Sequence, residues 1–258
     1  MSEDSASVLV VANPAAGNGT GTQAARRAVG ELEGAIAAGR TGSFLAGAQV
    51  DAAFLSSPDQ ARAIIEESAR HRAVIAVGGD GLAHLAVNAL MAIDPEQRPA
   101  FAVVPAGTGN DYARALGLPL DLRHAVHAIL KADPKPVDVG LCNGEYFAET
   151  LSFGLDAAIA LDTVQRRERT GRSDAGVYFS SGIDQLTHNL VARSYHGNFD
   201  GAHVEGKSVT FAVQIGPYYG GGFKICPEAK LDDGMLDICI SHPPVSIPRA
   251  IYIFMRAK

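Results

Sequence analysis

The sequence has no tryptophan, only three cysteines and no long apolar run. Three is an odd number, and Cys142, Cys226 and Cys239 lack the spacing of metal ligands, so neither a disulfide framework nor a zinc site is expected. No apolar stretch approaches the ~20 residues that cross a bilayer, and the polar, acidic start at Met1–Ser7 does not resemble a secretory signal. We expect a cytoplasmic protein that has no transmembrane segment and is peripheral to any membrane it meets.

Basic residues are also fewer than acidic ones. Lys and Arg number 22 against 28 Asp and Glu, which gives a formal net charge of −6, and no basic stripe is visible. A nucleic-acid partner is therefore not expected. The chain is instead rich in hydrophobic residues (47%) and in glycine, with 28 glycines in 258 residues, which suits a turn-rich globular protein of two modest domains.

The first half of the chain alternates short apolar runs with amphipathic stretches, which is typical of strand–helix units around a largely parallel sheet. The predicted fold class is therefore α/β. The expected strands are Ser7–Ala12, Val50–Leu55, Ala73–Val77 and Phe101–Val104. The expected helices are Thr22–Ala37, one opened by Pro58 and Asp59, Leu82–Met91, and one capped by Asn110 or Asp111.

The pattern changes near Pro134 and Pro136, where we place a domain boundary that divides the chain into residues 1–136 and 137–258. The later apolar runs alternate with period two or are bounded by Gly, Asn and Asp, which indicates an antiparallel sheet. The expected strands are Val137–Cys142, Tyr146–Ser152, Ser208–Ile215 and Met235–Ile240, and the expected helices are Asp156–Arg167, Val177–Val191 and an amphipathic Val245–Met255.

Three glycine-containing loops of the first half each follow a predicted strand and precede a helix: Asn13–Gly19, Gly78–Gly81 and Pro105–Asp111. In an open α/β sheet these loops lie at one edge, where backbone N–H groups and helix amino termini attract phosphate. Neither the P-loop motif nor the dinucleotide-binding glycine motif is present. The three loops predict a phosphate site, and ordinary tight turns are the alternative for any one of them.

Five stretches resemble the diacylglycerol kinase catalytic family, which includes sphingosine and ceramide kinases and related bacterial lipid kinases. They are NPAAGNG at Asn13–Gly19, GGDG at Gly78–Gly81, PAGTGNDYARALGLP at Pro105–Pro119, SFGLDA at Ser152–Ala157 and YYGGGFKICPEAKLDDGMLD at Tyr218–Asp237. The resemblance implies a phosphofructokinase-like α/β domain followed by a β-sandwich-like domain. It also implies a nucleotide-binding first domain, a lipid-binding second domain, and transfer of the γ-phosphate of ATP to a lipid hydroxyl.

The resemblance also implies which residues surround ATP. Asp80 is the expected catalytic residue, because a carboxylate beside polyphosphate needs Mg²⁺ or a donor network, and a loop-capping role is its alternative. Ser57 could replace Ser56 at the second strand end. The residues expected around the nucleotide are Asn13, Ser56, Gly78, Gly79, Asp80, Gly81, Gly107 and Thr108.

A second implied site is a structural Mg²⁺ loop in PEAKLDDGM, at Pro227–Met235. The ion would take the carboxylate of Asp233 and the backbone carbonyls of Lys230 and Met235, since a hard cation prefers oxygen ligands. The alternative is a plain Asp-Gly hairpin turn. ATP and Mg²⁺ are thus the expected cofactors.

The sequence departs from the family pattern in two places. After Gly81 the usual Thr and Glu are replaced by Leu82 and Leu85, and His84 resembles the sphingosine-kinase version of this turn or serves as an ordinary helix histidine. The family's Asp-Gly-Glu segment, whose acid takes the proton from the lipid hydroxyl, is absent before Lys258. We expect the second domain to be incomplete at its carboxyl end, and this chain alone to be weakly active or inactive.

Diacylglycerol is the first expected acceptor, and a sphingoid base is the second. An NAD kinase-like enzyme with a soluble acceptor and a non-catalytic lipid- or nucleotide-binding protein are the alternatives. Arg166, Arg167, Arg169 and Arg172 could face anionic headgroups or form a solvated surface. The expected partner is a lipid at a membrane surface, and both a monomer and a homodimer remain open.

Overall fold

The computed structural model describes residues 7–12, 21–172 and 175–256. Its contacts divide the chain into two compact units, Met1–Ala148 and Glu149–Lys258. The first unit is built on a parallel sheet and the second on an antiparallel sheet, which confirms the predicted α/β class and its two-part organisation. Within the described residues, no helix combines the length and apolarity that a membrane crossing requires.

The sheet of the first unit has four parallel strands in the order β2-β1-β3-β4. The strands are β1 (Ser7–Ala12), β2 (Gln49–Phe54), β3 (Ala73–Gly78) and β4 (Ala100–Pro105). Val10 of β1 lies opposite Ala52 on one side and Ile75 on the other. Each predicted strand of this half therefore forms, to within a residue or two at its ends.

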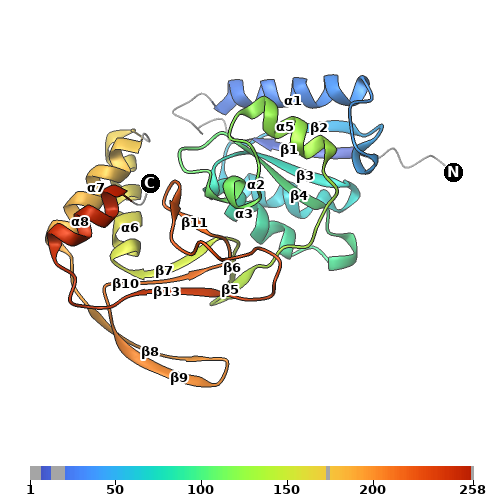
Figure 1. Cartoon of the computed structure of the whole chain (residues 1–258). Coiled ribbons are helices and arrows are strands. Elements are labelled where there is room, and N and C mark those ends of the chain that lie inside the picture. The colour runs from blue at the N-terminus through green and yellow to red at the C-terminus, as the bar shows by residue number, and fades with distance from the viewer. Residues whose placement is uncertain (1–6, 13–20, 173–174, 257–258) are drawn as a thin grey trace. The chain divides into compact units, whose positions relative to one another are not determined.

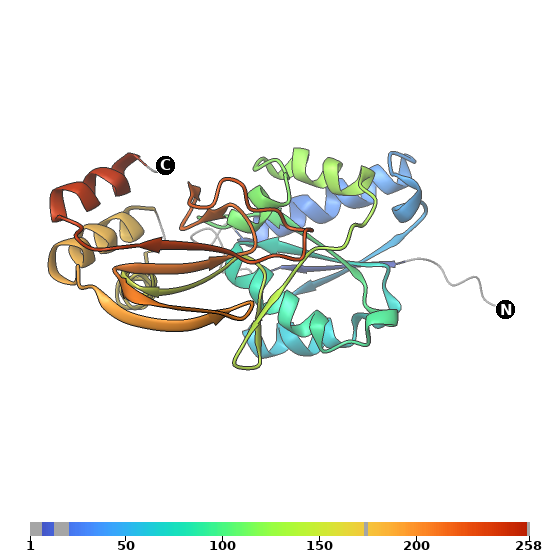
Figure 2. The ribbon, with the colours of Figure 1, turned by 60° about the horizontal axis from the view of Figure 1, so that its bottom comes forward.

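Helices cover both faces of this sheet, as Figures 1 and 2 show. The helices of the first unit are α1 (Gly21–Ala37), α2 (Pro58–Glu66), α3 (Asp80–Met91), α4 (Asp111–Ala115) and α5 (Leu122–Lys131). Val8 and Val10 pack in a core with α1 and α5, whereas Leu9 and Val11 pack in a core with α2 and α3. Because alternate side chains enter opposite cores, β1 is apolar throughout.

A short hairpin follows this sheet and lies with the first unit. It consists of β5 (Gly140–Cys142) and β6 (Glu145–Phe147). The Asn88 side chain of α3 accepts from Tyr146 N at 2.8 Å and donates to Tyr146 O at 2.8 Å. The compact units thus divide at Ala148/Glu149, twelve residues after the boundary predicted from the two prolines.

The second unit centres on a three-stranded antiparallel sheet in the order β13-β10-β7. A long hairpin and a short one accompany it. The strands are β7 (Thr150–Gly154), β8 (Arg193–Phe199), β9 (Ala202–Ser208), β10 (Thr210–Gln214), β11 (Tyr218–Tyr219), β12 (Phe223–Lys224) and β13 (Asp237–Ser241). Its helices are α6 (Leu155–Thr170), α7 (Ala175–His188) and α8 (Ile247–Arg256).

The predictions for this half were incomplete in three places, the first being the strand expected at Val137–Cys142, which covers only Gly140–Cys142. The single strand expected at Tyr146–Ser152 is two strands, β6 and β7, separated where the chain passes from one unit to the next. The hairpin β8–β9 was not predicted, because its strands are polar on one face and its apolar face is short. Tyr195 and Phe199 of that hairpin pack their rings against Phe211 of β10.

Candidate functional site

Two of the glycine loops meet at the carboxyl ends of neighbouring strands. β3 ends at Gly78 and β4 ends at Pro105, and Ala106 N donates to Gly78 O at 2.8 Å. A Cβ atom on Gly79 would lie 2.9 Å from the Cα of Gly107. Real Cβ atoms essentially never approach that closely, so both loops require glycine for backbone to pass backbone.

Asn110 fixes the shape of the second loop. Its backbone is left-handed, with φ 58° and ψ 39°, a conformation that Asn tolerates better than most residues. The side chain accepts from Gly107 N and donates to Gly107 O, both at 2.9 Å. Asn110 precedes α4 as predicted, but its side chain holds the glycine loop and does not cap the helix.

Asp80 begins α3 and reaches across to the start of α4. Its Oδ1 accepts from Tyr112 N at 3.2 Å. A carboxylate at the first turn of a helix is favourably placed in the helix dipole, and here it also bonds a backbone N–H of the neighbouring helix. Asp80 therefore has a structural contact with the start of α4, as a capping carboxylate would.

Gly81 differs from the other glycines of the site. It is exposed, and a Cβ atom placed on it would meet nothing within 4 Å. Packing therefore does not require glycine there, and open space lies beside the first turn of α3. Thr108, in the facing loop, is exposed as well.

The other residues expected around the nucleotide, Asn13 and Ser56, are not found beside the two glycine loops. Asn13 lies outside the described residues. Ser56 follows β2, which β1 separates from β3, so it lies about two strand spacings, ~10 Å, from the glycine loops. Its hydroxyl bonds Gln60 Oε1 at 2.8 Å, while Ser57 caps α2 by accepting from Gln60 N at 3.1 Å. Both serines thus help to begin a helix.

His84 is a surface residue of α3 in this structure. Its Nε2 lies 2.9 Å from Glu145 Oε1, and both side chains are largely exposed, at 46% and 70%. The contact joins α3 to the β5–β6 hairpin alongside the bonds of Asn88. The reading of His84 as an ordinary, satisfied helix histidine agrees with this contact.

The expected ion loop of the second unit forms a tight turn. Asp233 Oδ1 accepts from Met235 N at 3.1 Å, and Gly234 has a φ of 73°. Lys230 and Asp233 are exposed residues. One carboxylate and two carbonyls fit a hard cation, although the bond to Met235 is also what a plain turn would make. The described residues contain no cluster of three or more His, Cys, Asp or Glu side chains that could hold a metal.

The second unit contains a partly buried carboxyl that was not predicted from the sequence. Thr210 Oγ1 donates to Asp156 Oδ1 at 3.3 Å, and the Tyr219 phenol lies beside the same carboxyl. Burial raises the pKa of Asp156 to about 6, while the two hydroxyls oppose that rise. Burial and this carboxyl also raise the pKa of Tyr219. Asp156 lies in the SFGLDA stretch, but the sequence does not show that Tyr219 and Thr210 come to it.

Two family profiles match the chain. The profile of the diacylglycerol kinase catalytic domain matches residues 7–142, and that of the YegS C-terminal NAD kinase beta sandwich-like domain matches residues 149–251. The two matches fall in the two compact units. The loops described above therefore lie in the part that resembles the catalytic domain.

Individual proteins and solved structures that resemble this chain point to the same family as the profiles. A diacylglycerol kinase of Bacillus subtilis is 33% identical over 168 residues, which are 65% of this chain and 54% of that protein. A probable lipid kinase of the YegS-like kind from Pseudomonas aeruginosa is 30% identical over 83% of this chain and 68% of its own length. A diacylglycerol kinase structure from Bacillus anthracis superposes with a TM-score of 0.73 and 26% identity, covering 97% of this chain and 78% of that one. The chain belongs to the diacylglycerol kinase catalytic-domain family of lipid kinases.

Proposed function

We propose that this protein is an ATP-dependent lipid kinase that transfers the γ-phosphate of ATP to the hydroxyl of diacylglycerol and forms phosphatidic acid. The observation that carries the proposal is the junction of two glycine loops at neighbouring strand ends, with Gly79 against Gly107 and open space at Gly81. Such an edge of a parallel sheet is where α/β proteins bind phosphate groups. Diacylglycerol as the acceptor rests on the names of the relatives.

In this proposal the chain's own residues bind and orient the nucleotide. Backbone N–H groups of the two loops and of the first turn of α3 would face the phosphates, and Asn110 would keep the second loop in its bound shape. Asp80 would hold Mg²⁺ beside the nucleotide, where the ion would supply positive charge to offset that of the phosphates. Lys230, Asp233 and Met235 would hold a second, structural Mg²⁺ in the other unit.

The test is phosphate transfer from radiolabelled ATP, with Mg²⁺, to diacylglycerol in mixed micelles. Asp80→Asn keeps the side-chain size and one acceptor for Tyr112 N but loses the charge, so we expect its rate to fall at least ~100-fold. Asp133→Asn is the matched control, because Asp133 is an exposed carboxylate in the loop after α5. Lipid-dependent product that is unaffected by Asp80→Asn would contradict the assignment of Asp80.

The acceptor is tested separately. In parallel assays, diacylglycerol, a sphingoid base and NAD are offered to the same protein preparation. NAD is included because the second profile is that of an NAD kinase-like domain. Phosphorylation of NAD alone would replace the lipid kinase proposal, and no binding of Mg-ATP at all would contradict it.

A further inference from the structure

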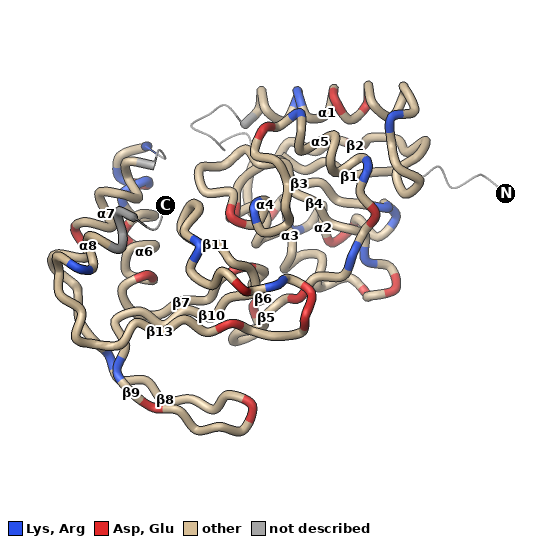
Figure 3. The backbone as a smooth tube through the Cα atoms, in the orientation of Figure 1, with Lys and Arg blue, Asp and Glu red and all other residues tan. Residues whose placement is uncertain are grey.

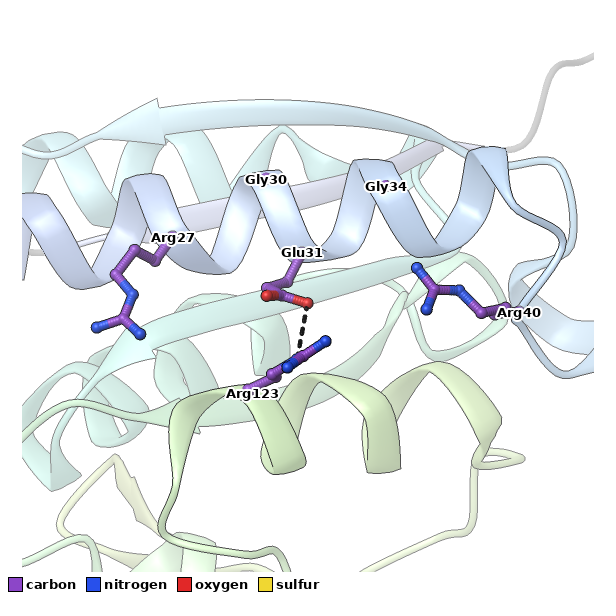
Figure 4. A pocket seen from close by; sticks show the side chains of 6 residues that line it. All are labelled: Arg27, Gly30, Glu31, Gly34, Arg40 and Arg123. Atoms are coloured by element: carbon purple, nitrogen blue, oxygen red, sulfur yellow. Dashed lines mark ion pairs between the residues drawn. The ribbon is translucent and has the colours of Figure 1, made fainter.

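A group of basic side chains lies away from the glycine loops, between α1 and α5 of the first unit. Arg27 and Glu31 project from α1, Arg40 follows the end of that helix, and Arg123 projects from α5. Figure 4 shows these side chains pointing into the space between the two helices, with Arg27 and Arg40 on either side of the Glu31–Arg123 pair. They line a hollow of about 470 Å³ that is open to solvent.

The position of these residues follows from helix periodicity. Residues at spacings of three, four and seven share one face of a helix, and Arg27, Gly30, Glu31 and Gly34 have these spacings along α1. Arg123 and His127 are four apart on α5 and face the same carboxylate. These residues of α1 and α5 therefore form one stripe that borders the hollow. Figure 3 marks the basic and acidic positions along the backbone.

The charges in this stripe are unequal. Glu31 Oε2 lies 3.5 Å from Arg123 Nε and 3.5 Å from His127 Nε2, so one carboxylate serves both. Asp121 lies at the start of α5, where the backbone N–H of His124 chiefly lowers the pKa of its carboxyl and the charge of Arg27 lowers it slightly. Three guanidinium groups against two carboxylates leave a local positive excess, although the whole chain carries a formal charge of −6.

The floor of the hollow is bare. Gly30 and Gly34 lie in the interior of α1, where glycine costs about 0.5–1 kcal/mol relative to alanine. Glycines in helices commonly allow a close approach of another element, but a Cβ atom on either residue would meet nothing within 4 Å. These two glycines keep space open between the arginines and do not serve packing.

We propose that the hollow between α1 and α5 is a binding site for a phosphate-bearing anion, held by Arg27, Arg40 and Arg123 over Gly30 and Gly34. Guanidinium groups match phosphate oxygens in geometry and bind them through two parallel hydrogen bonds. The volume lies within the range of about 300–1,000 Å³ that small-molecule sites occupy. A soluble phosphate compound and the headgroup of an anionic lipid share this chemistry.

Titration calorimetry with inorganic pyrophosphate at low ionic strength tests the site. The triple variant Arg27→Gln/Arg40→Gln/Arg123→Gln should bind at least about tenfold more weakly than the wild type. The matched control Arg62→Gln/Arg70→Gln/Arg193→Gln removes the same charge from exposed arginines that do not line the hollow and should bind as the wild type does. Because pyrophosphate can also enter the glycine loops, only the binding that differs between these two variants is assigned to the hollow.

A second variant tests whether binding needs the space in the hollow as well as its charges. Gly30→Leu/Gly34→Leu leaves every arginine in place and suits a helix, but fills the floor, so it should lose the same binding step. The proposal is overturned if the wild type shows no such step, if the leucine variant retains it, or if the control triple variant loses as much as the site variant. None of these results depends on kinase activity.

Binding to lipid vesicles distinguishes the two kinds of ligand, a lipid headgroup and a soluble phosphate compound. Sedimentation with phosphatidylcholine vesicles, with and without phosphatidic acid, is compared for the wild type and the site triple variant. Phosphatidic acid-dependent binding that the triple variant loses assigns the site to a lipid headgroup. Pyrophosphate binding without such sedimentation assigns it to a soluble phosphate compound.

Discussion

The two units bury their apolar side chains to different degrees. In the first unit, all of β3 and nearly all of β1 are buried between two layers of helices. In the second, β7 and β13 are only partly buried. Among the described residues, the large apolar side chains that remain exposed are Phe54, Leu120, Val137 and Leu141 in the first unit, and Phe153, Leu161, Val164, Phe179, Val191, Met235, Leu236, Ile238, Ile247 and Tyr252 in the second.

This difference separates two uses of apolar residues. A parallel sheet that is covered on both faces buries its apolar side chains in its own core, where they stabilise the unit. The antiparallel sheet and its helices leave more of their large apolar side chains in contact with solvent. An apolar surface of this kind suits the expectation, implied by the family resemblance, that the second domain binds lipid.

The largest effect that tests this comparison is on stability. Ile75 of β3 is completely buried, so Ile75→Ala should lower the free energy of unfolding by about 2–5 kcal/mol. Ile238 of β13 is 37% exposed, so Ile238→Ala should cost less, about 1 kcal/mol or below. Denaturant unfolding followed by circular dichroism measures both. Equal losses would show that the two sheets contribute alike, and the contrast between the units would fail.

The second test concerns the carboxyl of the second unit. The pKa of Asp156 is raised from 3.8 to about 6, so the folded protein holds this proton more tightly than the unfolded chain does. Its stabilising effect is complete below pH 3.8 and is lost as the pH rises to about 6. Asp156→Asn should therefore stabilise the protein by up to ~3 kcal/mol at pH 8 and leave it unchanged at pH 3.5.

Thermal unfolding of Asp156→Asn across this pH range measures the effect. Asp232→Asn is the control, because Asp232 is an exposed carboxylate of the same unit. A gain that is the same at every pH, or a loss at pH 8, would mean that the ionised carboxyl is not penalised by burial. Asp80, at the edge of the other sheet, differs from Asp156 because its carboxylate accepts a hydrogen bond from a backbone N–H.

The smallest effects separate two glycines of the candidate nucleotide site. Gly107→Ala forces a Cβ against the backbone of Gly79, so it should destabilise the protein by about 1–3 kcal/mol and weaken ATP binding. Gly81→Ala meets nothing and lies in a helix, so it should stabilise by about 0.5–1 kcal/mol. If nucleotide uses the space beside α3, Gly81→Ala still weakens ATP binding, as calorimetry would show. Unchanged ATP affinity in Gly81→Ala would place the nucleotide elsewhere.

Much of the first unit follows from local patterns. Its strands are buried on both faces and therefore stand out as short apolar runs, and Ser57 with Pro58 marks the start of α2. The hairpin β8–β9 carries no such signal, because one face of it is polar and the other finds its partner, Phe211, only in three dimensions. The division at Ala148 was missed for a related reason: the bonds of Asn88 to Tyr146, 58 residues away, attach the β5–β6 hairpin to the first unit.

Local sequence patterns were enough to predict the class of fold, the order of the glycine loops and the resemblance to a lipid kinase family, because each depends on residues that are near one another in the chain. Four contacts became visible only in three dimensions: Gly79 against Gly107, Asp80 with Tyr112 N, Tyr219 and Thr210 beside Asp156, and three arginines around one hollow. These contacts join residues that lie far apart in the sequence. Their energies depend on distance and burial, and the pairing of strands and helices sets both.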